Sequence, residues 1–70
     1  MNTDGKQPIA TLYRKKLGET LRKIRLQKGY SFPDIIYLTG LSKSTVTKVE
    51  SGEAKTIDSY INYAVSVEYP

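Results

Sequence analysis

Apolar residues recur along this chain at the three- and four-residue spacing of a helix, and short polar or glycine-containing turns separate the stretches in which they do so. This periodicity predicts an amphipathic helix in each stretch. The predicted helices span residues 8–28, 32–39, 43–51 and a last stretch that begins at Thr56 or Ile57. The window YAVSVEY in that last stretch also favours a strand, but a lone strand would have no partner. The pattern therefore predicts an all-α fold.

The first predicted helix begins at Pro8, which suits a first helical turn, and ends before Gly29, a suitable C-terminal stop. Its apolar face consists of Leu12, Tyr13, Leu17, Leu21 and Ile24. Gly18 lies inside this pattern and costs up to about 1 kcal/mol there. A start near Tyr13 or Leu17 is the alternative, and we favour one helix whose first turns fray.

The second and third predicted helices carry start and stop signals at each end. Ser31 and Asp34 form a capping-box pattern before the second helix, and Gly40 follows its last residue. Ser42 is positioned to cap the third helix and Gly52 to end it. Leu41 lies in the turn, and the inward residues of the third helix are Val46 and Val49. Two short helices joined by such a turn have the outline of a helix-turn-helix.

The fourth predicted helix and the chain ends complete the organisation. The apolar set of this helix comprises Ile57, Tyr60, Ile61, Ala64, Val65 and Val67. Residues 1–7 are polar and without periodicity, which predicts a disordered start. Residues 8–70 are then expected to form a single domain, because 70 residues are near the lower limit for one hydrophobic core.

Composition excludes most catalytic and metal-dependent functions. The chain contains no cysteine and no histidine, which removes the usual metal ligands, the commonest general base and the thiol nucleophile. No enzyme activity, metal or cofactor is therefore expected, and no two carboxylates show a plausible metal spacing. The start MNTDGKQP lacks the features of a signal peptide and no long apolar run occurs, which predicts a cytoplasmic protein without a membrane segment.

Positive charge is concentrated in the first part of the chain. The net charge is +4 at neutral pH. Residues 1–28 contain eight basic and two acidic residues, whereas residues 29–70 contain three basic and five acidic ones. Such an asymmetry is compatible with an anionic partner but does not identify one.

The segment from Leu17 to Gly52, with its glycine turn, resembles the Cro and lambda-repressor type of helix-turn-helix, the xenobiotic-response-element family of bacterial and phage regulators. The resemblance extends to about residue 69, since TIDSYINYAVSVEY is similar to the family's fourth helix. The positions that carry it are Leu21, Arg22, Arg25, Gly29, Ser31, Ile35, Gly40, Leu41, Ser42, Thr45, Val46, Glu50 and Gly52. It implies a bundle of four to five helices, although the chain stops where many members have a fifth helix.

The resemblance also implies a double-stranded DNA partner, with the third helix in the major groove. The base-contacting candidates are Lys43, Ser44, Thr45 and Lys48, whose ammonium, hydroxyl and methyl groups can meet base edges. The phosphate-contacting candidates are Arg22, Lys23, Ser31 and the backbone amide of Phe32. For the basic run from Arg14 to Lys16, a solvated helix end is slightly preferred over phosphate contacts. The family further pairs the residues matching Arg25 and Glu50 as a buried ion pair, which is a structural role.

Five positions depart from the family pattern. Ile36 occupies a position that is usually small, where two helices cross closely, and Thr39 occupies a usually aliphatic core position. Phe32 replaces a glutamine that in many members helps to contact the DNA backbone. Tyr37 and Leu38 are apolar at positions that the family tends to expose. These differences bear on the helix crossing and on the mode of dimerisation.

Six tyrosines among seventy residues leave two interpretations open. Their rings can serve as core bulk, or Tyr63, Tyr69 and Val65 can form a surface for a homodimer on DNA. A second class of function is a helical adaptor or antitoxin module that binds another protein through Tyr37, Leu38, Tyr63 and Tyr69 without sequence-specific DNA binding. The positively charged face of the third helix favours DNA over this alternative.

Overall fold

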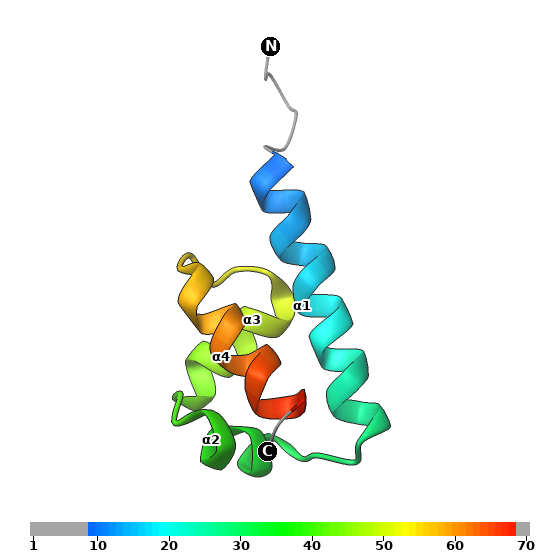
Figure 1. The fold of residues 1–70 in the computed structure, drawn as a ribbon. Helices are drawn as coiled ribbons and strands as arrows, with labels where there is room; N and C mark the ends of the chain where they lie inside the picture. Colours follow the sequence, from blue (N-terminus) through cyan, green and yellow to red (C-terminus); the bar gives the residue numbers. More distant parts are fainter. Residues whose placement is uncertain (1–8, 69–70) are drawn as a thin grey trace.

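The computed structural model describes residues 9–68, which form four helices: α1 (Ile9–Gln27), α2 (Phe32–Thr39), α3 (Lys43–Ser51) and α4 (Ile57–Glu68) (Figure 1). This arrangement confirms the all-α prediction, and the described part of the chain contains no strand. The predicted disordered start, Pro8 and Tyr69 lie outside the described residues. The YAVSVEY window is helical as far as Glu68.

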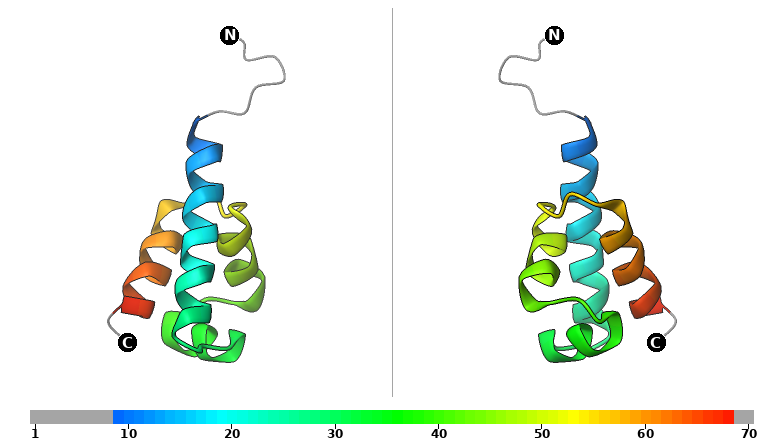
Figure 2. Two further views of the ribbon diagram at one scale, coloured as in Figure 1. Left: turned by 90° about the vertical axis from the view of Figure 1, so that its right-hand side faces the viewer. Right: turned by 90° about the vertical axis from the view of Figure 1, so that its left-hand side faces the viewer.

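The longest helix, α1, supports the other three along one side. Seen from that side, α4 and α3 lie to either side of α1, and α2 lies near its C-terminal end (Figure 2). The first turns of α1 extend beyond the rest of the bundle (Figure 1). At its other end, Gly29 has a φ of 75°, and the Tyr30 amide donates to the Arg25 carbonyl at 3.0 Å. This pattern of a left-handed glycine and a backward hydrogen bond ends the helix where the sequence predicts.

Gly18 lies inside α1, where the absence of a side chain allows α1 and α3 to pack closely. A Cβ atom at this position would lie 2.2 Å from the carbonyl oxygen of Val49 and 2.9 Å from that of Glu50. A glycine inside a helix is less stable than an alanine, but only a glycine allows the two backbones to cross this closely. Gly52 serves the same contact from the other side, since a Cβ there would lie 2.5 Å from the Cα of Lys15.

Both short helices start and end as their caps predict. The Ser31 hydroxyl accepts from the Asp34 amide at 3.2 Å, and the Asp34 carboxylate accepts from the Ser31 amide at 2.8 Å. The Ser42 hydroxyl accepts from the Thr45 amide at 3.1 Å. Gly40 and Gly52 close the two helices in the left-handed conformation. Local signals thus fix the ends of α2 and α3 to the residue.

The core lies where all four helices meet. Its buried apolar residues are Leu21, Ile35, Val46, Val49, Ala54, Tyr60, Tyr63 and Val67. Leu17, Ile24, Tyr30, Phe32, Ile36, Leu41 and Ala64 pack around them. Val46 and Val49 are fully buried, as predicted. The turn residue Leu41 is half-buried against the same core.

The predicted inward face of α4 is only partly correct. Tyr60 and Val67 are buried, but Ile57, Ile61 and Val65 are at least half exposed, while Tyr63 is fully buried. Nine of the twelve residues of α4 are apolar or serine, so spacing alone allows two faces. The buried face is the one on which tyrosine hydroxyls find partners: Tyr60 donates to the Ala54 carbonyl at 2.8 Å, and Tyr63 donates to Glu50.

Thr39, the polar residue at a core position, is fully hydrogen-bonded. Its hydroxyl donates to the Ile35 carbonyl at 2.7 Å and accepts from the Leu41 amide at 3.1 Å. The Thr39 carbonyl, at the end of α2, accepts from the Asn62 side chain at 2.9 Å. The buried hydroxyl therefore has both a donor and an acceptor partner, and the carbonyl connects the end of α2 to α4.

None of the helices between residues 9 and 68 combines the length and the apolar composition that crossing a lipid bilayer requires.

Candidate nucleic-acid interface

The third helix presents one anchored face and one free face. Val46 and Val49 are buried against the core, whereas Lys43, Ser44 and Lys48 are exposed on the opposite side. Three of the four base-contacting candidates therefore share an accessible surface. An exposed helix face with ammonium and hydroxyl groups and no exposed carboxylate among residues 43–49 can donate hydrogen bonds to the acceptor groups of guanine and thymine.

The fourth candidate, Thr45, lies at the edge of this face. It is half-buried, and its hydroxyl accepts from the Ser42 hydroxyl at 3.0 Å. Thr45 and Lys48 also line a hollow formed with the loop before α4 and the start of that helix, whose other lining residues are Glu53, Ala54, Lys55, Thr56 and Ser59. The structure thus places Thr45 beside the exposed lysines but gives its hydroxyl an intramolecular partner.

Two residues on the free face were not among the sequence candidates. Thr47 and Ser51 are exposed, at positions four and eight residues after Lys43. Their hydroxyls donate to backbone carbonyls one turn back, Thr47 to Lys43 at 3.0 Å and Ser51 to Lys48 at 3.1 Å. Their four- and eight-residue spacing from Lys43 would have predicted from the sequence that they lie on the same side of the helix. Their oxygens still have acceptor capacity toward a base amino group.

The start of α2 is less open to a phosphate than its sequence predicts. The Ser31 amide donates to Asp34, so this donor is already used, and the carboxylate adds negative charge at the helix start. The hydrogen bonds from Ser31 hold the pKa of Asp34 below its usual value. Phe32 is half-buried, with its ring 4.8 Å from the Arg25 guanidinium carbon. What remains for a phosphate is the Phe32 amide and the Ser31 hydroxyl proton.

Arg25 and Glu50 form the ion pair that ties α1 to the end of α3. The Arg25 Nε atom lies 2.7 Å from Glu50 Oε2, and Nη2 lies 3.3 Å from Oε1. Both side chains are about nine-tenths buried. Arg25 Nη1 also donates to the Tyr30 carbonyl at 3.0 Å. The hydrogen bond to Glu50 raises the pKa of Arg25, which therefore stays charged.

Tyr63 is the third member of this cluster, whereas the sequence left open whether its ring is core bulk or part of a partner surface. Its hydroxyl donates to Glu50 Oε2. Burial raises the pKa of Tyr63, and the hydrogen bond to Glu50 raises it further. The prediction that Tyr63 belongs to a dimer or partner surface is wrong, because its side chain is fully buried. The physical reason is that a buried carboxylate needs more donors than one arginine supplies in this geometry.

The remaining phosphate candidates are both exposed on α1. The Arg22 side chain is 58% exposed, and its Nε atom lies 3.9 Å from Glu50 Oε1. This contact is too long for a strong pair, so the guanidinium is still able to bind an anion. Lys23 is exposed as well.

The surface candidates for a protein partner are separated by the structure. Tyr37 is 87% exposed on α2. Leu38 is half-buried, and its carbonyl accepts from Ser66 at 3.4 Å. Tyr69 lies outside the described residues. Of the four residues proposed for such a surface, Tyr37 alone is well exposed among those described.

No group of three metal-ligating side chains occurs within residues 9–68. The candidate residues supply exposed cations and hydroxyls together with a backbone amide, and such groups can bind an anionic, hydrogen-bonding polymer. That combination, on a helix held by its apolar side against a second helix, defines a nucleic-acid-binding helix-turn-helix domain.

The comparisons with known proteins agree with this class. The sequence model of the helix-turn-helix domain family matches residues 16–59, which is more than half of the chain and includes α2, α3 and the turn between them. The chain belongs to this family of Cro-like helix-turn-helix domains. No curated protein and no solved structure matches the chain.

Proposed function

We propose that this protein is a sequence-specific DNA-binding transcriptional regulator, of phage-repressor or antitoxin type, that inserts α3 into the major groove. The observation that carries the proposal is the division of α3 into two faces. Val46 and Val49 are fully buried and fix the helix, while Lys43, Ser44 and Lys48 are exposed without an ion pair to another described residue. Such a protein acts by occupying an operator in the cytoplasm, without chemistry and without a cofactor.

The cluster around Glu50 supports the same assignment. Glu50 is the only acid in α3, and its carboxylate is held by Arg25 and Tyr63 on the inner side of the helix. A negative charge on the free face would repel phosphates. Because the Glu50 carboxylate is buried in the bundle, the free face of α3 carries positive charge only, which suits a DNA-facing surface.

The phosphate contacts come from Arg22, Lys23, the Ser31 hydroxyl and the Phe32 amide. About four such contacts per chain predict weak, strongly salt-dependent binding by one copy, with a log-log salt slope near 0.9 per contact. A single short helix reads only a half-site, so two copies on a two-fold operator are expected.

The test is selection of bound sequences from a random duplex pool at two salt concentrations, with the wild type and with Lys43→Ala. A palindromic motif is expected for the wild type, and loss of preference at one base position for Lys43→Ala. Lys28→Ala is the matched control, because it removes the same charge from an exposed residue that belongs to neither the proposed DNA contacts nor the first turns of α1, and it should leave base preference unchanged.

The second candidate is a helical adaptor or antitoxin module that binds another protein without sequence-specific DNA binding. The exposure of Tyr37 favours it, since this ring lines a shallow groove with Tyr30, Asp34 and Leu38. If the selection enriches no sequence at either salt concentration, the adaptor replaces the DNA regulator as the better assignment.

A further inference from the structure

The first turns of α1 expose apolar side chains on one side. We call residues 9–17 the α1 arm. Ile9 and Tyr13 are each 71% exposed and Leu12 is 52% exposed. Together with Lys16 they line one shallow groove along the helix. Three large apolar residues lie at this spacing on turns that extend beyond the bundle. Their exposure to water is unfavourable, and such a patch is typical of an interaction surface.

A second exposed apolar line runs along α4. Ile57, Ile61 and Val65 are 59%, 54% and 50% exposed. They stand four residues apart and therefore lie on one side of the helix, away from the buried Tyr60, Tyr63 and Val67. We call these three residues the α4 stripe.

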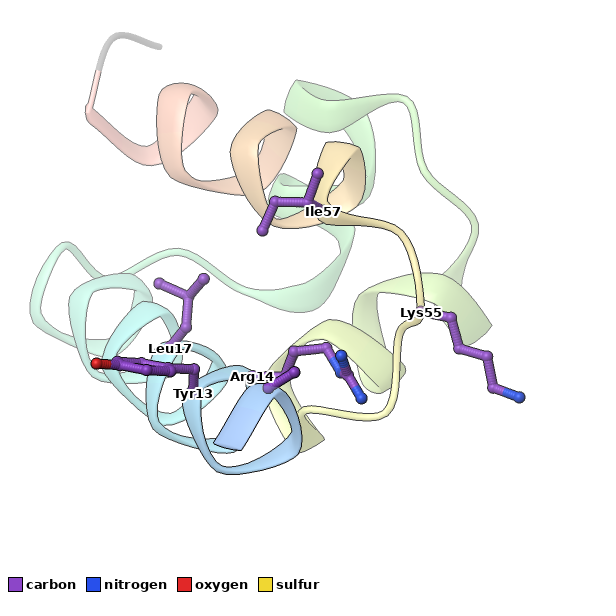
Figure 3. Close-up of a pocket in the computed structure, with 6 residues that line it drawn as sticks. Tyr13, Arg14, Leu17, Lys55 and Ile57 are labelled. Atoms are coloured by element: carbon purple, nitrogen blue, oxygen red, sulfur yellow. The ribbon is translucent and has the colours of Figure 1, made fainter. Parts of the chain in front are cut away.

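The α1 arm and the α4 stripe belong to one continuous surface. Tyr13 and Leu17 from α1 and Ile57 from α4 line a common hollow, whose other lining residues are Ala10, Arg14 and Lys55. Leu17 and Ile57 point toward one another across it, and the charged end of Lys55 points away (Figure 3). The two apolar lines thus meet at this hollow.

The two parts of this surface carry opposite charge. The α1 arm contains Arg14, Lys15 and Lys16 and no acid, whereas α4 contains Asp58 and Glu68 and no base. Contact between two α1 arms, or between two α4 stripes, would place like charges together. Contact between an α1 arm and an α4 stripe would place opposite charges beside matching apolar residues.

We propose that this surface is the interface of a two-fold dimer, in which the α1 arm of each copy covers the α4 stripe of the other. Two-fold symmetry requires that each contact occurs twice, and an arm that extends beyond its own bundle can reach a neighbour's α4. The second copy of this chain is the occupant because the chain itself supplies both charge-complementary halves. The dimer supplies the pair of α3 helices that the proposed function needs on a palindrome, and in that respect it rests on that function.

Sedimentation equilibrium of the full chain without DNA tests the interface. A dimer is expected for the wild type. Ile61→Lys adds a base opposite the basic arm, twice per dimer, and should raise the dissociation constant at least about tenfold. Tyr37→Lys is the matched control, an exposed aromatic on α2 replaced by the same base, and should leave the dissociation constant unchanged. Circular dichroism melting checks that both variants fold as the wild type does.

Reversing the charge of the arm distinguishes a self-complementary interface from one for another protein. Lys16→Glu alone should weaken the dimer, and combining it with Ile61→Lys should regain part of the loss, because the new acid of one copy meets the new base of the other. A wild type that stays monomeric at high concentration overturns the proposal, as does a dimer that Ile61→Lys leaves unchanged.

The two proposals fail separately. Selection of a duplex motif by a chain that sediments as a monomer would overturn the interface and leave DNA recognition standing. A dimer that Ile61→Lys weakens, but that enriches no duplex sequence, would overturn DNA recognition and leave the interface standing.

Discussion

The α2–α3 unit and the outer surface of α1 and α4 differ in how their side chains are used. In the α2–α3 unit each helix end is capped, the apolar residues of α3 are buried, and its polar residues other than Thr45 and Glu50 are exposed. On the outer surface, by contrast, the large apolar residues Tyr13, Ile57 and Ile61 are exposed. The difference shows that the same chain buries the apolar residues of its third helix completely and leaves those of the outer surface open.

The difference between the two regions has an energetic basis, which is the cluster around Glu50 that holds α3 in place. Glu50 joins α1, through Arg25, and α4, through Tyr63, to the end of α3. A helix of nine residues is too short to be stable by itself. Its orientation therefore depends on buried anchors, whereas the exposed α1 arm continues a helix that its packed second half already stabilises.

The largest effect is expected for Glu50→Ala. It leaves Arg25 buried without its partner, and loss of one member of a buried pair costs on the order of 3 to 5 kcal/mol. Urea unfolding followed by circular dichroism measures the loss. Equal unfolding free energies for the variant and the wild type would show that the pair does not anchor α3.

A matched pair of glycine substitutions tests how closely α1 approaches the α2–α3 unit. Gly40 and Gly52 have nearly the same φ, 73° and 77°. Gly40→Ala has open space and should cost about 1 to 2 kcal/mol for its left-handed backbone. Gly52→Ala should lose about 1 to 3 kcal/mol more, because its Cβ would overlap the backbone of Lys15. Equal unfolding free energies for the two variants would contradict this close approach.

A second pair of variants compares the two regions directly. Val46→Ala removes buried methyl groups from α3 and should lower the unfolding free energy by about 2 kcal/mol. Ile61→Ala removes a larger but exposed side chain from α4 and should change it by less than about 0.5 kcal/mol in the monomer. Denaturant titrations at low protein concentration make the comparison. A large loss for Ile61→Ala would mean that the stripe is packed within the chain.

Tyr63→Phe keeps the buried ring and removes only the hydroxyl that donates to Glu50. A hydrogen bond to a charged group contributes about 1.5 to 3 kcal/mol, so a loss near the lower value is expected. The pKa of Tyr63 is raised above its ordinary value of 10, so its contribution is complete below pH 10 and is lost as the pH rises further. Thermal unfolding between pH 8 and about 11.5 should show a steeper alkaline decline for the wild type than for the variant.

The smallest effect is expected for Asp34→Asn at the start of α2. The pKa of Asp34 lies below its ordinary value because of the hydrogen bonds from Ser31. The ionised carboxylate therefore stabilises the folded protein fully above the ordinary pKa of an aspartate, and this stabilisation is lost as the pH falls. The amide side chain of the variant does not titrate, but its oxygen can still accept from the Ser31 amide. Melting temperatures measured from neutral to acidic pH should therefore converge at low pH. A constant difference across that range would exclude ionisation as the cause.

Much of this protein was determined by its sequence alone. The ends of α2 and α3 follow from Ser31, Gly40, Ser42 and Gly52, because caps and left-handed glycines act within a few residues. The exposed face of α3 follows from the spacing of its valines. These features are local, and the family match covers the segment that contains them.

Other features were decided only by the tertiary structure. Spacing allowed two inward faces for α4, and the choice depended on Glu50 and Ala54, which accept the hydroxyls of Tyr63 and Tyr60. Gly18 is unfavourable in the helix considered alone and is required only because the backbone of α3 lies against it. Partners distant in sequence decide such positions, since a buried polar group or a close backbone contact has no signal in the local pattern of apolar residues.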